Sequence, residues 1–335
     1  MVYIYKKIIS GKPYYYLRMS KKINNKSVTK DIAYLGNDPQ KIEKKLESIE
    51  KIYKKEIRKA YRNIKKFITS EYILNKIKEQ KIKSNVYLEK NLLEEIESVK
   101  YHFNNYFLKE NELTIREIYN NYLIEFAYNT TSIEGNTINL QEAVKLLNEN
   151  ITPKNKTLRE IYDLQNTKKV FFNLLEKKKN INHKSIIEIH DNLLENIDNR
   201  TGYRFHDVRV FRSKFNTTPG KYVKSDMDIL LNWYKKIKKE LHPFVLASIF
   251  HQKFEKVHPF SDGNGRTGRM LVNIILMNHN YPPIIVRKKK RVDYLSSLSE
   301  GDNISLTKMD NKSFYKIIHF LGDELIINYW NNFLI

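Results

Sequence analysis

The spacing of apolar residues changes near residue 40, and this change limits the folds that the chain can adopt. Residues 1–36 hold three runs rich in Tyr, Val and Ile, separated by turn signals at 10–13 and 24–26. Such runs predict a small antiparallel β-meander. From Ile42 to Ile64 and beyond, apolar residues recur at helical spacing. We therefore expect a mainly α-helical protein with a small N-terminal β-meander and a helical extension.

The helical pattern continues along the chain with one interruption. We expect helices at about 88–108, 113–129, 157–178, 183–197, 225–240 and 243–256. The segment 201–223 instead combines turn residues with β-formers and predicts a hairpin inserted between helices; it includes Gly202, Tyr203, Phe205, Val208, Val210, Phe211, Pro219 and Gly220. This pattern predicts a meander of unassigned role at 1–36, a helical extension at 37–112 and a helical domain at 113–335.

The composition argues against several classes of protein. The chain has no cysteine, so it has no disulfide, no thiolate metal site and no cysteine nucleophile. The N-terminal residues lack the pattern of a signal peptide. No apolar run is long enough to cross a membrane. The expected location is cytoplasmic, with no membrane partner.

The chain is strongly basic, with a formal net charge of +22. A basic protein can bind nucleic acid because its Lys and Arg residues release counterions from phosphates. Lysines spread evenly over helix exteriors are more often solvated faces. The sequence therefore leaves a nucleic-acid partner open but does not favour one.

The segment from His258 to Arg269, HPFSDGNGRTGR, carries the strongest chemical signal. It links two apolar helical runs. Gly263 and Gly265 let backbone amides converge on a ligand, and the helix that follows adds its unpaired amides and positive dipole end. Arg266 and Arg269, three residues apart, share a helix face. The segment predicts a binding site for several phosphates.

Two further side chains in this segment suit chemistry on phosphates. Asp262 is a carboxylate beside the predicted phosphate site, where such groups commonly hold Mg²⁺. His258 has an ordinary pKa close to neutrality, which suits a base that takes a proton from an attacking hydroxyl. Each residue by itself is a weak indication, but together they predict the transfer of a phosphate-containing group to a hydroxyl.

This segment resembles the motif of the Fic family, His-x-Phe-x-Asp/Glu-Gly-Asn-Gly-Arg-x-x-Arg, with every fixed position filled. The resemblance covers about residues 113–305 and implies a Fic-type helical bundle with its core near 183–285. It also implies a protein adenylyltransferase that moves AMP from ATP, with Mg²⁺, to a Tyr, Thr or Ser hydroxyl. Gly265 stands where the related Doc-type kinases have Lys, which favours nucleotide transfer over phosphate transfer.

The resemblance also implies roles for individual residues. His258 would deprotonate the target hydroxyl, and Asp262 would hold Mg²⁺. Arg266 and Arg269 would bind the phosphate tail, with Arg269 as the anchor of the γ-phosphate. Phe260 would fix the loop as a core plug. The backbone amides of three residues would cradle the phosphates: Gly263, Asn264 and Gly265.

A second segment, residues 130–136 with the sequence TTSIEGN, resembles the family's inhibitory motif. The implied role is that Glu134 pairs with Arg269 and keeps it from the γ-phosphate. Thr131 and Glu134 also fit an ordinary capping box at the start of a helix. A third interpretation is that Glu134 orients a water molecule for the removal of AMP.

Other parts of the chain resemble the family less specifically. Residues 201–223 resemble its target-binding flap, which could add a strand of the target protein next to His258. Tyr281 and Tyr294 could line an adenine pocket, but core packing is an equal alternative for both. The resemblance leaves self-modification and a homodimer open. A DNA-binding regulator with a Fic-like core, acting through residues 1–110, is the alternative from another class.

Overall fold

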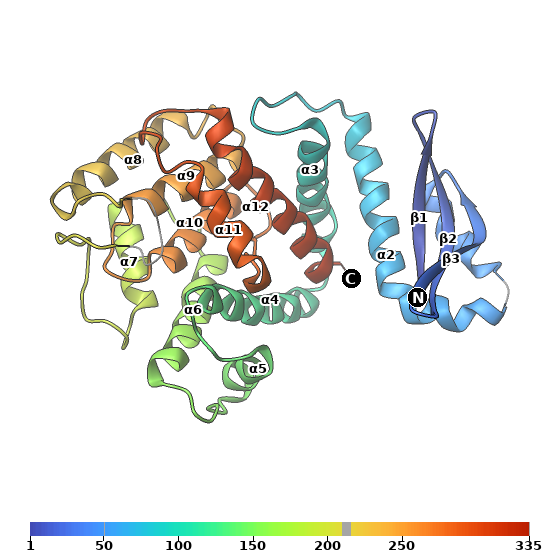
Figure 1. The fold of residues 1–335 in the computed structure, drawn as a ribbon, viewed down its shortest axis with the longest axis horizontal. Coiled ribbons are helices and arrows are strands. Elements are labelled where there is room, and N and C mark those ends of the chain that lie inside the picture. The colour runs from blue at the N-terminus through green and yellow to red at the C-terminus, as the bar shows by residue number, and fades with distance from the viewer. Residues whose placement is uncertain (50, 210–215, 335) are drawn as a thin grey trace. The chain divides into compact units, whose positions relative to one another are not determined.

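The computed structural model describes residues 1–49, 51–209 and 216–334, which form two compact units (Figure 1). Unit 1 spans Met1–Lys83, and unit 2 spans Ser84–Phe333. None of the described helices is both long and apolar enough to cross a bilayer. Unit 2 carries the 258–269 segment, and unit 1 carries the predicted meander.

Unit 1 begins with the expected three-stranded antiparallel sheet. Its strands are β1 (Val2–Ile9), β2 (Lys12–Ile23) and β3 (Lys26–Gly36), in that spatial order. The β1–β2 turn contains Gly11 at φ 75°, and the β2–β3 turn contains Asn24 and Asn25 at φ 48° and 61°. Glycine and asparagine tolerate this left-handed backbone best, so the turn residues explain the tight connections. The predicted meander is confirmed.

One face of the sheet packs against a long helix. A short turn η1 (Pro39–Lys41) and helix α1 (Ile42–Glu47) lead to α2 (Lys51–Glu79). The apolar positions of α2 recur every three or four residues, so they form one stripe that meets the sheet. The core of unit 1 is made from both elements: Val2, Ile4, Tyr15, Leu17, Leu35, Ile42, Ala60, Ile64 and Ile68.

The described part of unit 2 is helical. Its elements are α3 (Lys90–Asn105), η2 (Phe107–Lys109), α4 (Glu112–Ile133), α5 (Leu140–Glu149), α6 (Leu158–Glu176), α7 (His183–Leu193), η3 (Gly220–Tyr222), α8 (Val223–Ile237), α9 (Pro243–Val257), α10 (Asn264–Asn278), η4 (Lys288–Lys290), α11 (Arg291–Ser299) and α12 (Asn311–Asn332). Several begin with a side-chain cap; Asn139 and Thr157, for example, each form a capping box.

Helices α9 and α10 form the centre of unit 2. They pack on each other; α9 also contacts α8 and α12, and α10 contacts α4, α6 and α7 (Figure 1). Nearly every side chain of both helices is buried, polar ones included. A helix enclosed on all sides loses its polar face. The turn that joins these two helices is therefore held by packing from several directions.

The structure divides the helical extension predicted at 37–112. Helices α1 and α2 belong to unit 1, whereas α3 belongs to unit 2, where it packs on α12. The helix α12, which the sequence analysis did not single out, contributes buried apolar residues to this contact. Local periodicity predicts both helices but not their partners, because the contact joins residues more than 200 positions apart.

The hairpin predicted at 201–223 is not seen in the described residues. Residues 201–209 and 216–219 form no strand, and Gly220–Tyr222 is a helical turn. The two arms are joined by a side chain, since Thr217 Oγ1 donates to the Val208 carbonyl at 2.8 Å. Val210 and Phe211 lie outside the described residues. Side chains make the contacts in the described parts of the two arms, and the hairpin stays a prediction for the rest of the segment.

We predict that Ile64→Ala weakens unit 1 without weakening unit 2. The side chain is 2% exposed in the core between α2 and the sheet. Its truncation should lower the free energy of unfolding of unit 1 by about 2–5 kcal/mol. Hydrogen exchange read by mass spectrometry should show faster exchange within residues 1–83 only. Tyr61→Ala, at an exposed position of the same helix, is the matched control, and equal loss of protection in residues 84–333 would contradict the prediction.

Candidate active site

The turn between α9 and α10 has an unusual backbone at both ends. His258 ends α9 in the left-handed conformation, at φ 52° and ψ 60°, and its amide donates to the Phe254 carbonyl at 3.0 Å. Gly263 precedes α10 at φ 75°, and a Cβ there would lie 3.2 Å from the Leu194 side chain. A left-handed backbone at a histidine is uncommon and has to be held by its surroundings.

Asn264 and Phe260 fix the shape of the turn. The Asn264 side chain accepts from the Phe260 amide and donates to the Phe260 carbonyl, both at 2.8 Å. The Phe260 ring is fully buried and stacks on His190, with ring centroids 3.6 Å apart. His190 Nε2 in turn donates to the Asp262 carbonyl at 3.1 Å. The predicted role of Phe260 as a plug agrees with this packing.

The first turn of α10 has backbone amides without partners in the helix. The Thr267 amide donates to the Gly263 carbonyl at 2.9 Å, and no side chain caps the helix. The amides of the three residues before Thr267 therefore face the turn, where the helix dipole favours an anion. Asn264 and Gly265 are two of these three, whereas the amide of Gly263, the third residue of the predicted cradle, donates to Asp262 Oδ1 at 2.6 Å.

The carboxylate of Glu134 lies against this first turn. A Cβ built on Gly265 would be 2.2 Å from Glu134 Oε1, so a side chain at this position would require the carboxylate to shift. Glu134 Oε1 also accepts from Arg269 Nη2 at 2.6 Å. Arg269 is held further by Thr130, whose hydroxyl and carbonyl accept at 2.6 and 2.9 Å. The pair predicted from residues 130–136 is formed.

The alternative role of Glu134 in a capping box is excluded by its place in the helix. Glu134 follows the last residue of α4, and Thr131 lies inside the last turn rather than before the first. The Thr131 hydroxyl donates to the Ala127 carbonyl at 2.8 Å, one turn back. Residues 130–136 therefore include the end of α4, and the side chain of Glu134 points toward α10.

The charges of this pair are strongly coupled. Burial alone would raise the pKa of Glu134, but Arg269, Arg266 and His258 outweigh it, and the pKa lies below its usual range. Burial alone would lower the pKa of Arg269, but the effects of Glu134 and Tyr294 are larger and raise it above its usual value. The guanidinium therefore stays charged. The Glu134 side chain is 39% exposed whereas that of Arg269 is 3% exposed. The carboxylate therefore faces solvent, and the guanidinium lies beneath it.

The surroundings of His258 favour a neutral imidazole. Burial, with a smaller effect from Arg204, lowers the pKa of His258 to about 4. The ring is therefore neutral at neutral pH. Nδ1 lies 3.3 Å from the Glu255 carbonyl, which fits a proton on Nδ1 and a free lone pair on Nε2.

Asp262 and Arg266 are joined to residues of α6. Asp262 forms a close ion pair with Arg159, and Arg266 forms one with Asp163. Arg266 Nη2 is also 3.4 Å from Asp262 Oδ1. Burial lowers the pKa of Arg266 to about 10, and its Nε has no partner among the described residues. Arg266 is thus a buried cation with one N–H group that still lacks a hydrogen-bond acceptor.

The donor set fits Mg²⁺ only together with a phosphate ligand. Asp262 is 34% exposed and reaches the turn, but no group of three or more His, Asp or Glu side chains in the described chain could hold a metal. Mg²⁺ is commonly bound by one or two carboxylates, with phosphates and water completing its shell. Asp262 can supply the single protein ligand of such an ion.

Two residues that the sequence did not indicate also shape the site. Arg204 is buried and donates to carbonyls of His258, Thr218 and His206 at 2.8, 2.6 and 2.7 Å. It therefore ties the end of α9 to both arms of 201–223. Glu255 lies behind Gly268, and burial raises its pKa to about 8. Nothing in the local pattern distinguishes either residue from an ordinary surface charge.

The two predicted adenine-pocket residues occupy different places. Tyr294 is buried beside the site, where its hydroxyl is 2.6 Å from His251 Nε2 and 3.5 Å from Arg269 Nη1. Tyr281 instead contacts Glu97 and His242, and His242 lies just before α9. The 15 residues of α9 separate that end from His258 by about 22 Å. The structure therefore does not bring Tyr281 to the turn.

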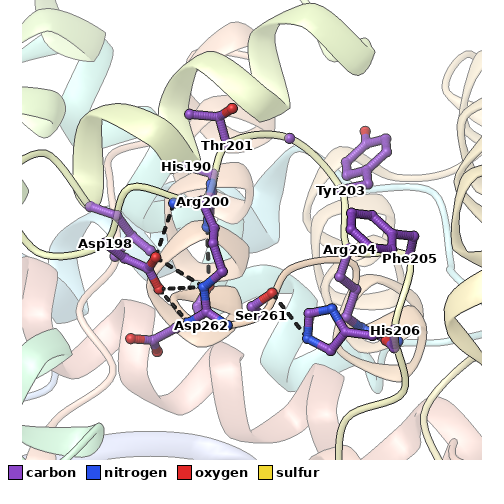
Figure 2. Close-up of a pocket in the computed structure, with 12 residues that line it drawn as sticks. His190, Asp198, Arg200, Thr201, Tyr203, Arg204, Phe205, His206, Ser261 and Asp262 are labelled. Atoms are coloured by element: carbon purple, nitrogen blue, oxygen red, sulfur yellow. Dashed lines mark hydrogen bonds and ion pairs between the residues drawn. The ribbon is translucent and has the colours of Figure 1, made fainter.

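A small cavity of about 110 Å³ opens beside Asp262 (Figure 2). Its walls are the Asp198–His206 stretch, His190 and Leu194 near the end of α7, and the Ser261–Asp262 turn. Ser261 Oγ and His206 Nε2 are 3.4 Å apart across it, and Arg200 pairs with Asp198. The first arm of the predicted flap thus borders the turn that holds the candidate metal ligand.

Comparison with known proteins agrees with this geometry. Residues 180–276 match the model of the Fic/DOC family. The protein adenylyltransferase Fic of Aedes aegypti is 35% identical over 191 residues, which cover 53% of this chain and 38% of that protein. Protein adenylyltransferase fic-1 of Caenorhabditis elegans is 32% identical over 179 residues, which cover 52% and 35%. The chain thus spans less than half the length of these curated relatives.

Solved structures share the fold over a longer stretch. A Fic family protein from Desulfovibrio desulfuricans G20 has a TM-score of 0.61 at 25% identity, covering 76% of this chain and 78% of that one. A Fic domain protein from Bacteroides thetaiotaomicron has a TM-score of 0.64 at 22% identity, covering 70% and 95%. The chain therefore shares the fold of these Fic proteins, and residues 180–276, which match the Fic/DOC family model, include the whole turn from His258 to Arg269.

Proposed function

We propose that the protein transfers AMP from ATP to a hydroxyl side chain of a protein. One observation carries the proposal: a neutral imidazole and an uncapped helix N-terminus face the same turn, within a Fic domain. The names of the relatives state the same activity. The intact turn argues against the alternative of a regulator with a degenerate Fic core.

In this reaction His258 acts as the general base. Nε2 accepts the proton of the target hydroxyl as the hydroxyl oxygen attacks the α-phosphorus of ATP. The bond from the α-phosphorus to the bridging oxygen breaks, and pyrophosphate leaves with that electron pair. The Arg204 guanidinium holds the His258 carbonyl, so the imidazole is in position before the nucleotide arrives.

The phosphate groups would occupy the anion site at the start of α10. The free amides of the first turn and the cation of Arg266 stabilise negative charge without having to rearrange. Asp262 would hold Mg²⁺, which screens the charge of the phosphates when bound. Arg269 would receive the terminal phosphate once Glu134 has left it.

We further propose that Glu134 inhibits the transfer. Its carboxylate occupies the space above Gly265 and binds the guanidinium predicted to anchor the γ-phosphate. A protein carboxylate in an anion site competes with the anionic ligand for the same donors. The target would be presented by the flap region, and self-modification would use the same geometry.

We predict that Glu134→Gly raises the incorporation of label from [α-³²P]ATP into protein. The substitution frees Arg269 and the space above Gly265, so the γ-phosphate can take its productive place. Glu134→Gln is the matched control, because it keeps the size of the side chain but removes its charge; it should give an intermediate rate. His258→Ala in the Glu134→Gly background should lose about 10²–10⁴-fold.

The same assay distinguishes the alternatives. Label from the γ position, without label from the α position, would mean phosphate transfer and would contradict the proposed reaction. Equal labelling by Glu134→Gly and the wild type, where His258→Ala is silent, would contradict inhibition by Glu134. If instead Glu134→Gly abolished release of AMP from a modified target, Glu134 would serve AMP removal.

The pH dependence follows from the lowered pKa of His258. The base form exists above the pKa, and loss of the Glu134 charge, which raises the pKa of His258, lowers that pKa further; the rate of Glu134→Gly should therefore be nearly constant from pH 6 to 8 and should fall only at about pH 4 or below. Initial rates measured with circular dichroism at each pH would separate this loss from unfolding. A fall centred near pH 6.5 in folded protein would show an unperturbed imidazole and contradict the buried position of His258.

A further inference from the structure

The positive charge of the protein is concentrated in unit 1. Residues 1–83 contain 23 Lys and Arg against 8 Asp and Glu, a net charge of +15 out of the +22 of the whole chain. The other 252 residues therefore carry only +7. A compositional bias shared by the whole chain would not divide in this way. The expectation of evenly spread lysines is thus wrong when the two units are counted separately.

The sheet of unit 1 has one face that α2 does not cover. The inward residues of β1 and β2 form the core with α2, so the alternate residues point away from it. Three tyrosines stand in register across the three strands on this outward face, because Tyr5 pairs with Tyr16 and Tyr16 pairs with Tyr34. Tyr3 and Arg18 form the next row. We call this surface, together with the basic residues Lys7, Lys12 and Lys22, the tyrosine face.

The tyrosine face carries more basic than acidic side chains. Alternation places four basic side chains on it: Lys7, Lys12, Arg18 and Lys22. Asp31 is the one acidic residue among residues 1–36, and Arg18 neutralises it through two hydrogen bonds, of 2.6 and 3.3 Å. Such an excess of positive charge on one sheet surface complements a polyanion.

The rings of this face are already in contact with protein groups. Tyr16 and Tyr34 are 5.3 Å apart between ring centroids, and the Arg18 guanidinium lies 3.6 Å above the Tyr5 ring. Base stacking on single strands needs open ring faces. Tyrosine hydroxyls and lysines, in contrast, can bond phosphates while the rings remain packed.

We infer that the tyrosine face binds the phosphate backbone of duplex DNA. Strands are about 4.8 Å apart, so side chains on the outer strands of a three-stranded sheet can reach phosphates on both sides of the B-DNA major groove, which is about 12 Å wide. Sheets and two-stranded ribbons of known DNA-binding proteins enter this groove. The major groove of an RNA duplex is too deep and narrow for such a sheet. This inference is independent of the transferase activity.

The test is fluorescence anisotropy of the full chain with a labelled DNA duplex of about 20 base pairs, over a series of salt concentrations. Lys7→Glu/Lys22→Glu reverses two exposed charges of the tyrosine face. It should weaken binding about tenfold or more at 0.1 M salt and lower the slope of log K against log salt by about 2. Lys235→Glu/Lys239→Glu, at exposed positions in and just after α8 of unit 2, makes the same change in net charge and should alter the affinity by less than about twofold.

Each other outcome overturns the inference. Equal losses in the two double variants would show attraction to the charge of the whole chain rather than to this face. Tighter binding to single-stranded DNA or to an RNA duplex of the same sequence would assign the face to another nucleic acid. Absence of binding to all three probes at 0.1 M salt would exclude nucleic acid as the partner. Circular dichroism of both variants confirms that the sheet is intact.

Discussion

The first turn of α10 favours an anion, and the proposed function depends on this preference. Three amides of this turn have no partner within the helix. The carboxylate of Glu134 lies beside Gly265 and binds Arg269. In the proposed function, Glu134 and the terminal phosphate of the nucleotide compete for this guanidinium, so inhibition and catalysis would use one electrostatic site.

Buried cations give the site its rigidity. Asp163 holds Arg266 from α6, and the Arg204 guanidinium is satisfied by backbone carbonyls instead of a carboxylate. A buried guanidinium is costly unless its donors are paired, so each of these contacts restricts where the neighbouring backbone can lie. Arg204 also binds the carbonyl of His258, whose backbone is left-handed. In the proposed reaction, this arrangement would fix His258 and the start of α10 relative to each other before any substrate binds.

The sequence predicted those parts of the site that are local in the chain. The order of residues from His258 to Arg269 already contains the helix end, the glycine turn and the next helix start. Glu134 could be found only because its segment resembles an inhibitory motif; its partner lies 135 residues away. Arg159 and Asp163 contact the site from α6, and each lies 103 residues before its partner, Asp262 or Arg266. No periodicity in the sequence predicts contacts over such a separation.

Two parts of the chain are placed by contacts that their local sequence does not reveal. Tyr281 follows α10 directly in the chain, but its hydroxyl is drawn to Glu97 and His242 at the far end of α9. The β-formers of 201–223 did not make strands in the described arms, because side-chain bonds from Arg204 and Thr217 replace a ladder there. The meander of unit 1, in contrast, was predictable, since turn residues and alternation agree along all three strands.

The most direct test of the central claim is a crystal structure of Glu134→Gly with a non-hydrolysable ATP analogue. Phosphate oxygens should lie on the amides of the first turn of α10, with the terminal phosphate on the Arg269 guanidinium. The α-phosphorus should face His258 Nε2 across the space for a hydroxyl. Phosphates bound elsewhere, or an imidazole turned away from the α-phosphorus, would contradict it.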